Sequence, residues 1–244
     1  MSISVLPSEP MPSSLPADLA IIIPAYNEQE AVAEVVRAAC GLSQRVIVVD
    51  DGSQDATATV AREAGAIVLS LTLQLGAWGA TQTGIRYALA QGCAYVVTLD
   101  ADGQHEPAFV PNLLKPMLTG QADVVIGACP ARVSPLRRLA WRYFKLLTGL
   151  AIEDLTSGFR AYNHKAMQLL ASKEASLLDY QDVGVLMLLR RRRLRIEEVP
   201  VTMWPRLKGA SRVFPSWWVV LKYMLESSVL CIADIGRHRR DKTS

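Results

Sequence analysis

The sequence predicts an α/β fold in which a mainly parallel, Rossmann-like sheet is flanked by helices. Short, continuously apolar segments alternate with segments of helical apolar spacing, as expected for strands that are buried on both faces. Polar residues gather directly after the apolar segments that end at Ile23, Val49 and Leu99. The chain has 244 residues and is 50% hydrophobic, which is enough for one sizeable domain.

The first half of the chain alternates between strands and helices. Apolar runs predict strands at residues 19–23, 45–49, 66–71, 94–100 and 122–128. Apolar residues at helical spacing predict helices at residues 28–41, 54–65, 76–92 and 107–120, the last of them broken by prolines. Because the carboxyl ends of parallel strands meet at one edge, the polar residues after these strands are expected to form a ligand site there.

The pattern loosens after Val133. The second half predicts a basic amphipathic helix at 135–149, a polar loop at 153–163, a helix that runs into a strand over 186–204, and a basic loop at 205–212. No repeat interrupts this order, so residues 19–212 are expected to form one domain.

The two ends differ in composition from this domain. Residues 1–18 are rich in proline and serine and predict a disordered tail without the features of a signal peptide. Residues 213–244 predict a C-terminal amphipathic helix and a basic tail. Lys222 and Glu226 interrupt its apolar stretch, which makes it marginal as a membrane span. We expect it to lie on a membrane surface, with packing on the domain or a contact in a homo-oligomer as the alternatives.

Charge and cysteine content suggest where the protein works. The net charge of +3 is modest, and no nucleic-acid partner is expected. Four widely spaced cysteines form no C-x-x-C pair, so we expect buried, reduced thiols in a cytoplasmic protein. The C-terminal segment extends this expectation to a peripheral position on the inner face of the membrane.

Asp100 and Asp102 follow the fourth predicted strand and have two interpretations. Aspartate and glycine are common turn residues, so one D-x-D is weak evidence by itself. Two carboxylates on a rigid turn also supply the hard oxygen ligands that Mg²⁺ or Mn²⁺ uses to hold phosphate. Other acids are expected at the same edge, and basic residues follow in the second half; together they suit a metal-bound nucleoside diphosphate.

Six motifs occur in a fixed order along the chain: PAYNE at 24–28, VVDDGSQDAT at 48–57, QLGAWGATQTGIRYAL at 74–89, LDADGQH at 99–105, TSGFRAY at 156–162 and EEVPV at 197–201. Together they resemble the family-2 glycosyltransferases of GT-A fold, above all the dolichyl- and polyprenyl-phosphate mannosyltransferase-like enzymes. The resemblance covers about residues 19–212. It implies an inverting transfer of sugar from GDP-mannose or a UDP-sugar to a polyprenyl phosphate or a glycan, with Mg²⁺ or Mn²⁺.

The resemblance also implies roles for individual residues. The donor is expected to contact Pro24, Tyr26, Glu28, Asp50, Asp100, Ala101, Asp102, Gln104 and Arg160. The expected metal ligands among them are Asp100, Asp102 and Gln104. Arg206 and Arg212 match the basic R-x-x-G-x-S-[K/R] loop that closes over the donor in the family, and they are the expected catalytic cations.

Three positions depart from the family pattern and concern mainly the acceptor side. Cys129 and Gln74 stand where the family often has an arginine and an asparagine. Gly184 stands where an acid often precedes the basic run, and Asp182 is the candidate to replace it. A sugar hydroxyl acceptor would need a general base, for which Asp182 is the candidate, whereas a phosphate acceptor is already anionic.

Two other functions fit part of the sequence. An aspartyl-nucleophile phosphotransferase would use Asp100, but in such enzymes the motif opens the first strand rather than the fourth. A non-catalytic nucleotide-sugar-binding subunit would account for the departures at Cys129 and Gly184. His105 is expected to be a structural hydrogen-bonding residue or a support for a metal ligand.

Overall fold

A seven-stranded sheet forms the centre of the computed structural model, which describes residues 15–129, 141–143, 145, 152–178 and 182–204. The strands lie in the order β3-β2-β1-β4-β6-β5-β7. Their bounds are β1 (Leu19–Ala25), β2 (Arg45–Asp50), β3 (Ile67–Ser70), β4 (Tyr95–Thr98), β5 (Val124–Ala128), β6 (Arg160–Asn163) and β7 (Ile196–Pro200). All pairs are parallel except those that β6 makes with β4 and β5.

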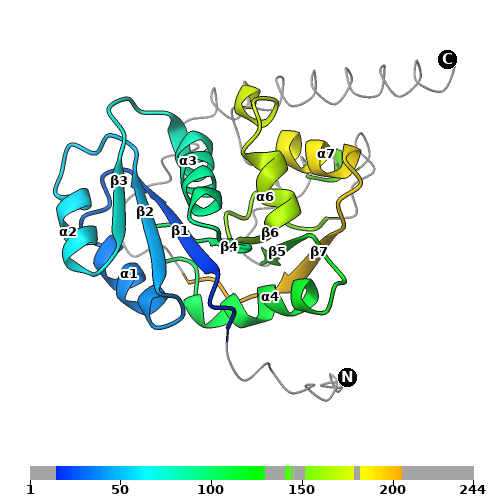
Figure 1. The fold of residues 1–244 in the computed structure, drawn as a ribbon, viewed down its shortest axis with the longest axis horizontal. Coiled ribbons are helices and arrows are strands. Elements are labelled where there is room, and N and C mark those ends of the chain that lie inside the picture. The colour runs from blue at the N-terminus through cyan, green and yellow to red at the C-terminus, as the bar shows by residue number, and fades with distance from the viewer. Residues whose placement is uncertain (1–14, 130–140, 144, 146–151, 179–181, 205–244) are drawn as a thin grey trace, which may run out of the picture.

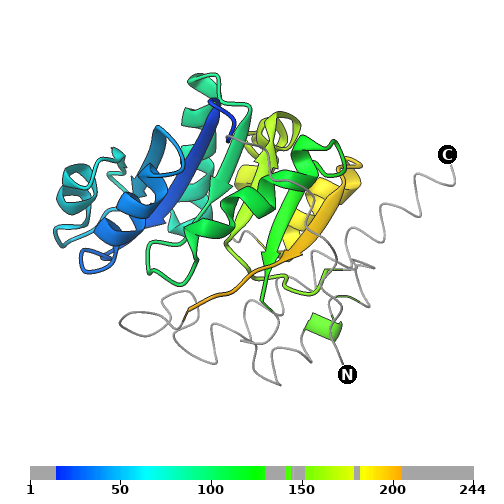
Figure 2. The same cartoon turned by 90° about the horizontal axis from the view of Figure 1, so that it is seen from below.

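Helices cover both faces of the sheet. They are α1 (Val32–Cys40), α2 (Thr57–Glu63), α3 (Gly76–Ala90), α4 (Val110–Leu118), α6 (His164–Leu170) and α7 (Val183–Arg191), with single 3₁₀ turns at η1 (Pro107–Phe109) and η3 (Ala175–Leu177). Figure 1 shows α1, α2 and α4 on one face and α3, α6 and α7 on the other. Seen from below, α1 (blue) and α4 (green) lie across the same face (Figure 2). The predicted α/β fold class is confirmed.

Alternation along the strands divides the core into two layers. In β1, Ile21 and Ile23 pack in the layer with α1 and α4, whereas Ala20 and Ile22 pack in the layer with α3. The approach of α3 to β1 is close, because a Cβ atom at Gly84 would lie 2.5 Å from Ile22 Cγ2. Continuously apolar strands therefore mean burial on both faces.

The strand order creates a topological switch point between β1 and β4. Helices α1 and α2 connect β1, β2 and β3 on one face, and α3 then returns on the other face to β4. The loops that leave β1 and β4 therefore diverge although the two strands are hydrogen-bonded neighbours. Open α/β sheets bind ligands outside the carboxyl ends of the strands at such a point.

The second half of the sheet corrects two sequence expectations. Residues 153–163 were expected to form a polar loop, but Arg160–Asn163 form β6, which inserts antiparallel between β4 and β5. Helix α6 was not predicted, although Asn163 gave a signal for it, because its Oδ1 accepts the N–H of Ala166 at 3.0 Å as an N-cap. A four-residue strand that contains arginine carries too little apolar pattern to be recognised locally.

Of the other sequence predictions, some are confirmed, one is wrong in part and several concern residues that the structure does not describe. The helix expected at 107–120 is confirmed as η1 followed by α4, with Pro116 inside it. Cys93 is buried as expected, but Cys40 is exposed, so the expectation of buried thiols is wrong there. Of the helix predicted at 135–149, most lies outside the described residues, as do the tail, the basic loop and the C-terminal helix. None of the described helices is long and apolar enough to cross a membrane.

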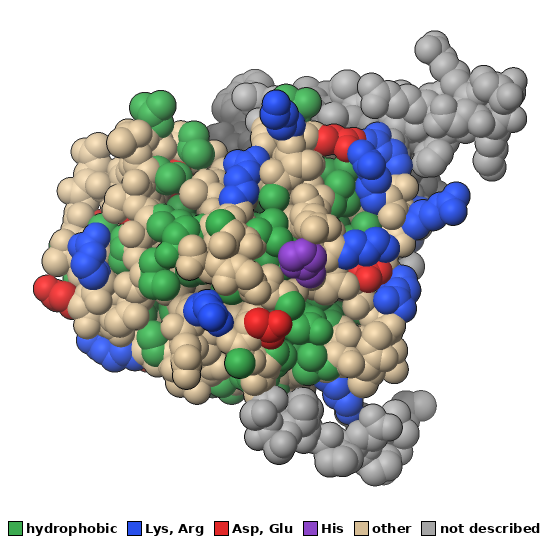
Figure 3. Space-filling view, in the orientation of Figure 1, with side chains coloured by type: hydrophobic (Ala, Val, Ile, Leu, Met, Phe, Trp, Pro, Cys, Tyr) green, Lys and Arg blue, Asp and Glu red, His purple; other side chains and the backbone are tan. Residues whose placement is uncertain are grey.

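Basic side chains gather on the side of the molecule formed by α6 and α7, where Figure 3 shows most of the lysine and arginine colour. Arg191 and Arg192 at the end of α7 form ion pairs with Glu174. More than half of the Arg192 side chain is exposed. Ion pairs on such an exposed face add little stability.

Asp123 joins the three strands at the β7 side of the sheet. Its Oδ2 accepts the backbone N–H of Arg195 at 2.8 Å, and its Oδ1 accepts Nδ2 of Asn163 at 3.0 Å. Burial raises the pKa of Asp123, but the hydrogen bonds from Arg195 and Asn163 and the charge of Arg195 outweigh it and hold the pKa below its ordinary value. The ionised carboxylate is therefore the form that stabilises this joint.

We expect Asp123→Asn to lower the free energy of unfolding at neutral pH by about 1–2 kcal/mol, because it removes a charged acceptor from buried hydrogen bonds. The unfolded state binds the proton more tightly than the folded state. The stabilisation is therefore complete above the unfolded pKa of about 4 and disappears as the pH falls through the folded pKa. Urea unfolding at a series of pH values should show the variant and the wild type converging in acid. A constant difference between them would contradict this role.

Candidate functional site

The loops that follow β1 and β2 are fastened to each other. The N–H of Asn27 donates to Ser53 Oγ at 2.8 Å, and Asn27 Oδ1 accepts the N–H of Gln54 at 2.7 Å. Asn27 has a φ of 52°, a left-handed conformation that asparagine tolerates better than most residues. One residue further, the N–H of Glu28 donates to Thr57 Oγ1 at 2.8 Å. These contacts hold the expected nucleotide-binding segment 24–28 beside the end of β2.

Asp50 and Asp51 at the end of β2 have different environments. Asp50 pairs in register with Ala25, and its Oδ1 accepts the N–H of Ser53 at 3.2 Å. The two oxygens of Asp51 accept the N–H groups of Leu75 and Gly76 at 2.7 and 2.8 Å, where α3 begins. Burial raises the pKa of Asp51, with these amides opposing the rise and the charge of Asp50 adding to it. Asp51 is thus fixed at the helix start, and Asp50 is the acid at the edge of the site.

The turn after β4 carries the acids of the D-x-D motif. Asp102 is buried, and its Oδ1 accepts the N–H of Gln104 at 3.0 Å. Gly103 between them has a φ of 76°, which glycine adopts without strain. The Asp100 side chain is 41% exposed. The turn therefore presents one carboxylate to solvent and fixes the other by a local hydrogen bond.

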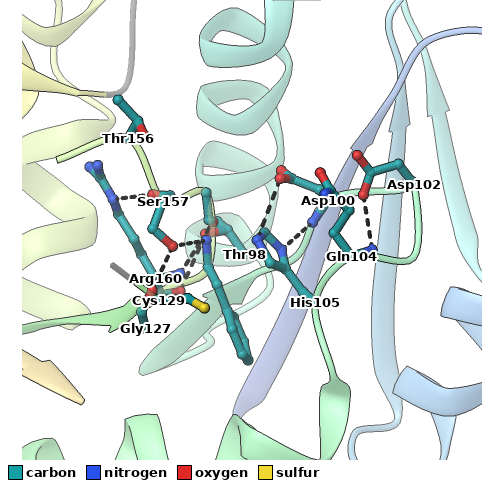
Figure 4. A network of polar contacts seen from close by, with 12 residues as sticks. Thr98, Asp100, Asp102, Gln104, His105, Gly127, Cys129, Thr156, Ser157 and Arg160 are labelled. Carbon is teal, nitrogen blue, oxygen red and sulfur yellow. Dashed lines mark hydrogen bonds and ion pairs between the residues drawn. The ribbon is translucent and has the colours of Figure 1, made fainter. Parts of the chain in front are cut away.

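His105 lies behind this turn. Its ring is fully buried, and its Nδ1 accepts the backbone N–H of Asp100 at 3.0 Å. Its Nε2 lies 3.5 Å from Asp100 Oδ2. The ring stacks on Phe159 with a centroid distance of 5.1 Å. Figure 4 shows the ring with both nitrogens directed toward Asp100.

The loop before β6 approaches the same carboxylate. Thr98 Oγ1 donates to the carbonyl oxygen of Gly158 at 2.6 Å. Ser157 Oγ donates to the carbonyl oxygen of Gly127 at 2.7 Å, as Figure 4 shows. These bonds fix the loop between the ends of β4 and β5. A Cβ atom on Gly158 would lie 2.6 Å from Asp100 Oδ1, so any side chain here would displace the Asp100 carboxylate. Gly158 belongs to the TSGFRAY motif, but the sequence alone indicated no role for it.

The chain beyond β7 returns to the D-x-D turn. Figure 2 shows it (orange) leaving β7 past the end of β5. The N–H of Trp204 donates to the carbonyl oxygen of Gln104 at 2.9 Å, and its indole Nε1 donates to Glu106 Oε2 at 2.8 Å. Met203 forms an isolated antiparallel bridge with His105. The segment that leads into the predicted basic loop is thus attached to the turn.

Some predicted site residues do not take the expected place. Arg160 was expected to contact the donor, but it is fully buried in β6, where its Nε and a terminal nitrogen donate to the carbonyl oxygens of Ser157 and Leu155 at 2.8 and 2.9 Å. The guanidinium stabilises the loop before β6, and a contact of Arg160 with the donor stays a prediction. Asp182 is 8% exposed and precedes α7, where its carbonyl oxygen accepts the N–H of Leu186. Arg206 and Arg212 lie outside the described residues.

Cys129, which departs from the family pattern, forms a backbone hydrogen bond with the loop before β6. The N–H of Cys129 donates to Asp154 Oδ2 at 3.2 Å, and Glu198 accepts the N–H groups of Glu153 and Asp154 at 2.7 and 2.8 Å. The EEVPV motif therefore holds the loop that carries Gly158, a role that the sequence did not indicate. Glu198, the second acid of the motif, therefore stabilises this loop through its two hydrogen bonds.

The donor set at the turn fits a divalent cation that prefers oxygen ligands. Two carboxylates and an amide carbonyl are hard ligands suited to Mg²⁺ or Mn²⁺. Gln104 Nε2 donates to the carbonyl oxygen of Trp204 at 3.4 Å, so the cation ligand from this side chain would be Oε1. In the described part of the chain, no group of three or more His, Cys, Asp or Glu side chains is placed to hold a metal. Phosphate oxygens of a ligand would therefore have to complete the coordination.

Known proteins are similar to this chain in sequence and in fold. The family model for glycosyl transferase family 2 matches residues 20–176. The undecaprenyl-phosphate mannosyltransferase of Micrococcus luteus is 33% identical over 216 residues, covering 79% of this chain and 86% of that protein. The polyprenol monophosphomannose synthase of Mycolicibacterium smegmatis is 30% identical over 216 residues, covering 79% and 80%. Glucosyl-3-phosphoglycerate synthase of Mycobacterium tuberculosis, solved with Mn²⁺ and UDP-glucose, has a TM-score of 0.61 at 25% identity, covering 78% and 72%.

Proposed function

Because the chain belongs to glycosyl transferase family 2, we propose that this glycosyltransferase moves a sugar from a nucleotide-sugar donor to a polyprenyl phosphate, with a divalent metal at the D-x-D turn. One observation carries the proposal. Asp100 and Asp102 leave β4, and the segment with Tyr26 and Glu28 leaves β1, on the two sides of the switch point. This arrangement is typical of the GT-A fold, and acids at this sheet edge support the proposal of a metal-bound diphosphate there.

Individual residues supply donor binding. Asp50, at the end of β2, is placed to accept hydroxyl or N–H groups of the nucleoside beside the segment 24–28. Asp100, Asp102 and the Gln104 carbonyl would hold the cation that neutralises charge on the departing diphosphate. An acceptor oxygen would attack the anomeric carbon from the side opposite the diphosphate. The new carbon–oxygen bond forms as the bond to the diphosphate oxygen breaks, the nucleoside diphosphate leaves with that oxygen, and the anomeric centre is inverted.

The acceptor is proposed to be a lipid phosphate rather than a glycan. The names of both relatives specify polyprenyl- or undecaprenyl-phosphate products or acceptors. A phosphate oxygen is already a nucleophile, so the reaction needs no general base. Asp182, which precedes α7 and is nearly buried, is then not required as one. A lipid acceptor would also bring the protein to a membrane surface, where the segment 213–244 is expected to bind.

Two classes of nucleotide sugar are proposed as the donor. The two relatives are mannosyl transferases by name, whereas the solved structure holds UDP-glucose. We therefore propose GDP-mannose or a UDP-sugar. The aspartyl-nucleophile alternative loses its support, because Asp100 follows β4 in the centre of the sheet and not the first strand of the domain. Its carboxylate lies beside Gly158 and His105 in a family-2 glycosyltransferase domain.

A thermal-shift screen followed by a transfer assay tests this function. UDP-, GDP- and dTDP-sugars are each added to the full chain with Mg²⁺, with Mn²⁺ or with EDTA. A ligand present at about 100 times its dissociation constant stabilises the folded state by about 2.7 kcal/mol, so one donor should raise the unfolding temperature only when metal is present.

The stabilising donor is then incubated with a polyprenyl phosphate, and the lipid-linked sugar is measured. Transfer that requires the metal supports the enzyme. Binding without transfer or hydrolysis would favour the non-catalytic subunit instead. No stabilisation by any nucleotide sugar would overturn the donor assignment.

A further inference from the structure

The protonation of the His105 ring follows from its hydrogen bond to the backbone. Nδ1 accepts the N–H of Asp100 at 3.0 Å, so this nitrogen carries a lone pair rather than a proton. The proton of the neutral ring then lies on Nε2, the nitrogen 3.5 Å from Asp100 Oδ2. The same side chain therefore holds the backbone of Asp100 and directs an N–H toward its carboxylate.

The carboxylate of Asp100 has an open side and a closed side. Its side chain is 41% exposed, whereas the His105 ring behind it is fully buried. Phe159 stacks on that ring at 5.1 Å and keeps it in place. Gly158 approaches Oδ1 from the loop before β6 without a side chain. A ligand would therefore approach the carboxylate from its exposed side.

We propose that His105 is a positioning residue that sets the orientation of the Asp100 carboxylate toward the metal–diphosphate complex. The inference rests on the proposed function and adds a residue to it. Contacts of this kind are often long in the absence of ligand and shorten in the complex, which suits the distance of 3.5 Å. Loss of such a support for a metal-binding carboxylate lowers metal affinity by about 10- to 100-fold.

Two variants separate the two hydrogen-bonding functions of the ring. His105→Asn keeps an acceptor near the Nδ1 position for the N–H of Asp100 and removes the donor at Nε2. His105→Gln reaches the Nε2 position with an amide N–H and gives up the acceptor at Nδ1. If the asparagine variant does not fold, His105→Phe is used instead. Its ring can stack on Phe159 but lacks both the acceptor and the donor, so the glutamine variant, which restores only the donor, should bind Mn²⁺ more tightly than it.

The readout is Mn²⁺ affinity rather than turnover. Free Mn²⁺ is measured by electron paramagnetic resonance during titration of the full chain with saturating UDP or GDP, whichever stabilises the wild type. We expect the asparagine variant to bind Mn²⁺ at least about 10-fold more weakly, and the glutamine variant to lie between it and the wild type. Gln82→Met is the matched control, since it removes a buried hydrogen bond of 2.7 Å to Leu170 on the other face of the sheet.

The outcomes separate this inference from the proposed function. A wild type that binds no Mn²⁺ together with either nucleotide would overturn both. If the wild type binds Mn²⁺ and both His105 variants bind it with the same affinity as the wild type, the positioning role alone is overturned. A purely structural role of His105 would lower the unfolding temperature as Gln82→Met does, and would leave the Mn²⁺ affinity unchanged or favour asparagine over glutamine.

Discussion

Asp102→Asn should reduce sugar transfer by about 100-fold or more while leaving the protein folded. The amide removes the negative charge of a proposed metal ligand, and the loss of one well-placed electrostatic contact in the transition state has an effect of this size. The fold should persist because asparagine Oδ1 can still accept the N–H of Gln104, which Asp102 binds at 3.0 Å. Initial rates of transfer to polyprenyl phosphate, with the unfolding temperature measured in parallel, check both parts.

Asp55→Asn is the matched control for this variant. Asp55 Oδ1 accepts the N–H of Thr57 at 2.9 Å, the same contact two residues along the chain, but Asp55 follows β2 rather than β4. We expect this variant to retain most of the activity. Transfer by Asp102→Asn at the wild-type rate, or wild-type transfer in EDTA, would show that the D-x-D turn holds no catalytic metal.

Gly158→Ala should lower the affinity for Mn²⁺ with nucleoside diphosphate by about 10- to 100-fold. The new methyl group would lie 2.6 Å from Asp100 Oδ1 and 3.1 Å from Oδ2, so the carboxylate must turn away. The carboxylate is partly exposed and can rotate, which means that the effect should fall on binding rather than on folding. Calorimetric titration with nucleoside diphosphate and Mn²⁺, alongside thermal unfolding, measures the two effects separately.

Gly41→Ala provides the comparison for a glycine that has room for a side chain. Gly41 ends α1 with a φ of −69°, and its nearest neighbour to a new Cβ is Ala38 O at 3.4 Å. This substitution should leave metal and nucleotide binding unchanged. If Gly158→Ala binds Mn²⁺ and nucleoside diphosphate as tightly as Gly41→Ala does, the loop before β6 does not constrain the Asp100 carboxylate.

Much of the donor site could be predicted from local sequence. Apolar strands followed by polar residues placed Asp50, Asp100 and Asp102 at one sheet edge, and the structure has them at the ends of β2 and β4. Parallel strands have this property because their carboxyl ends share an edge. The order of the motifs predicted the GT-A fold, which the comparisons confirm. The roles of Tyr26, Glu28 and Gln104 stay predictions.

Arg160 shows where local sequence was insufficient. It was expected to contact the donor, as one of the basic residues of the second half that could neutralise the charge of a diphosphate. In the structure that segment is β6, and antiparallel pairing with β4 and β5 buries the side chain. Its guanidinium binds carbonyl groups of the preceding loop. Pairing of β6 with β4, which lies more than sixty residues earlier, cannot be inferred from four residues of apolar pattern.

The sequence alone determined the class of fold, the family resemblance and the acids of the D-x-D turn, because apolar periodicity and turn chemistry are local properties. The tertiary structure decided how those acids are supported. His105 comes from the connection between β4 and η1, and Gly158 comes from the loop before β6; the two meet at the Asp100 carboxylate. Trp204 reaches the same turn from beyond β7. Such contacts depend on the order of strands in the sheet, since that order alone brings distant segments to one carboxylate.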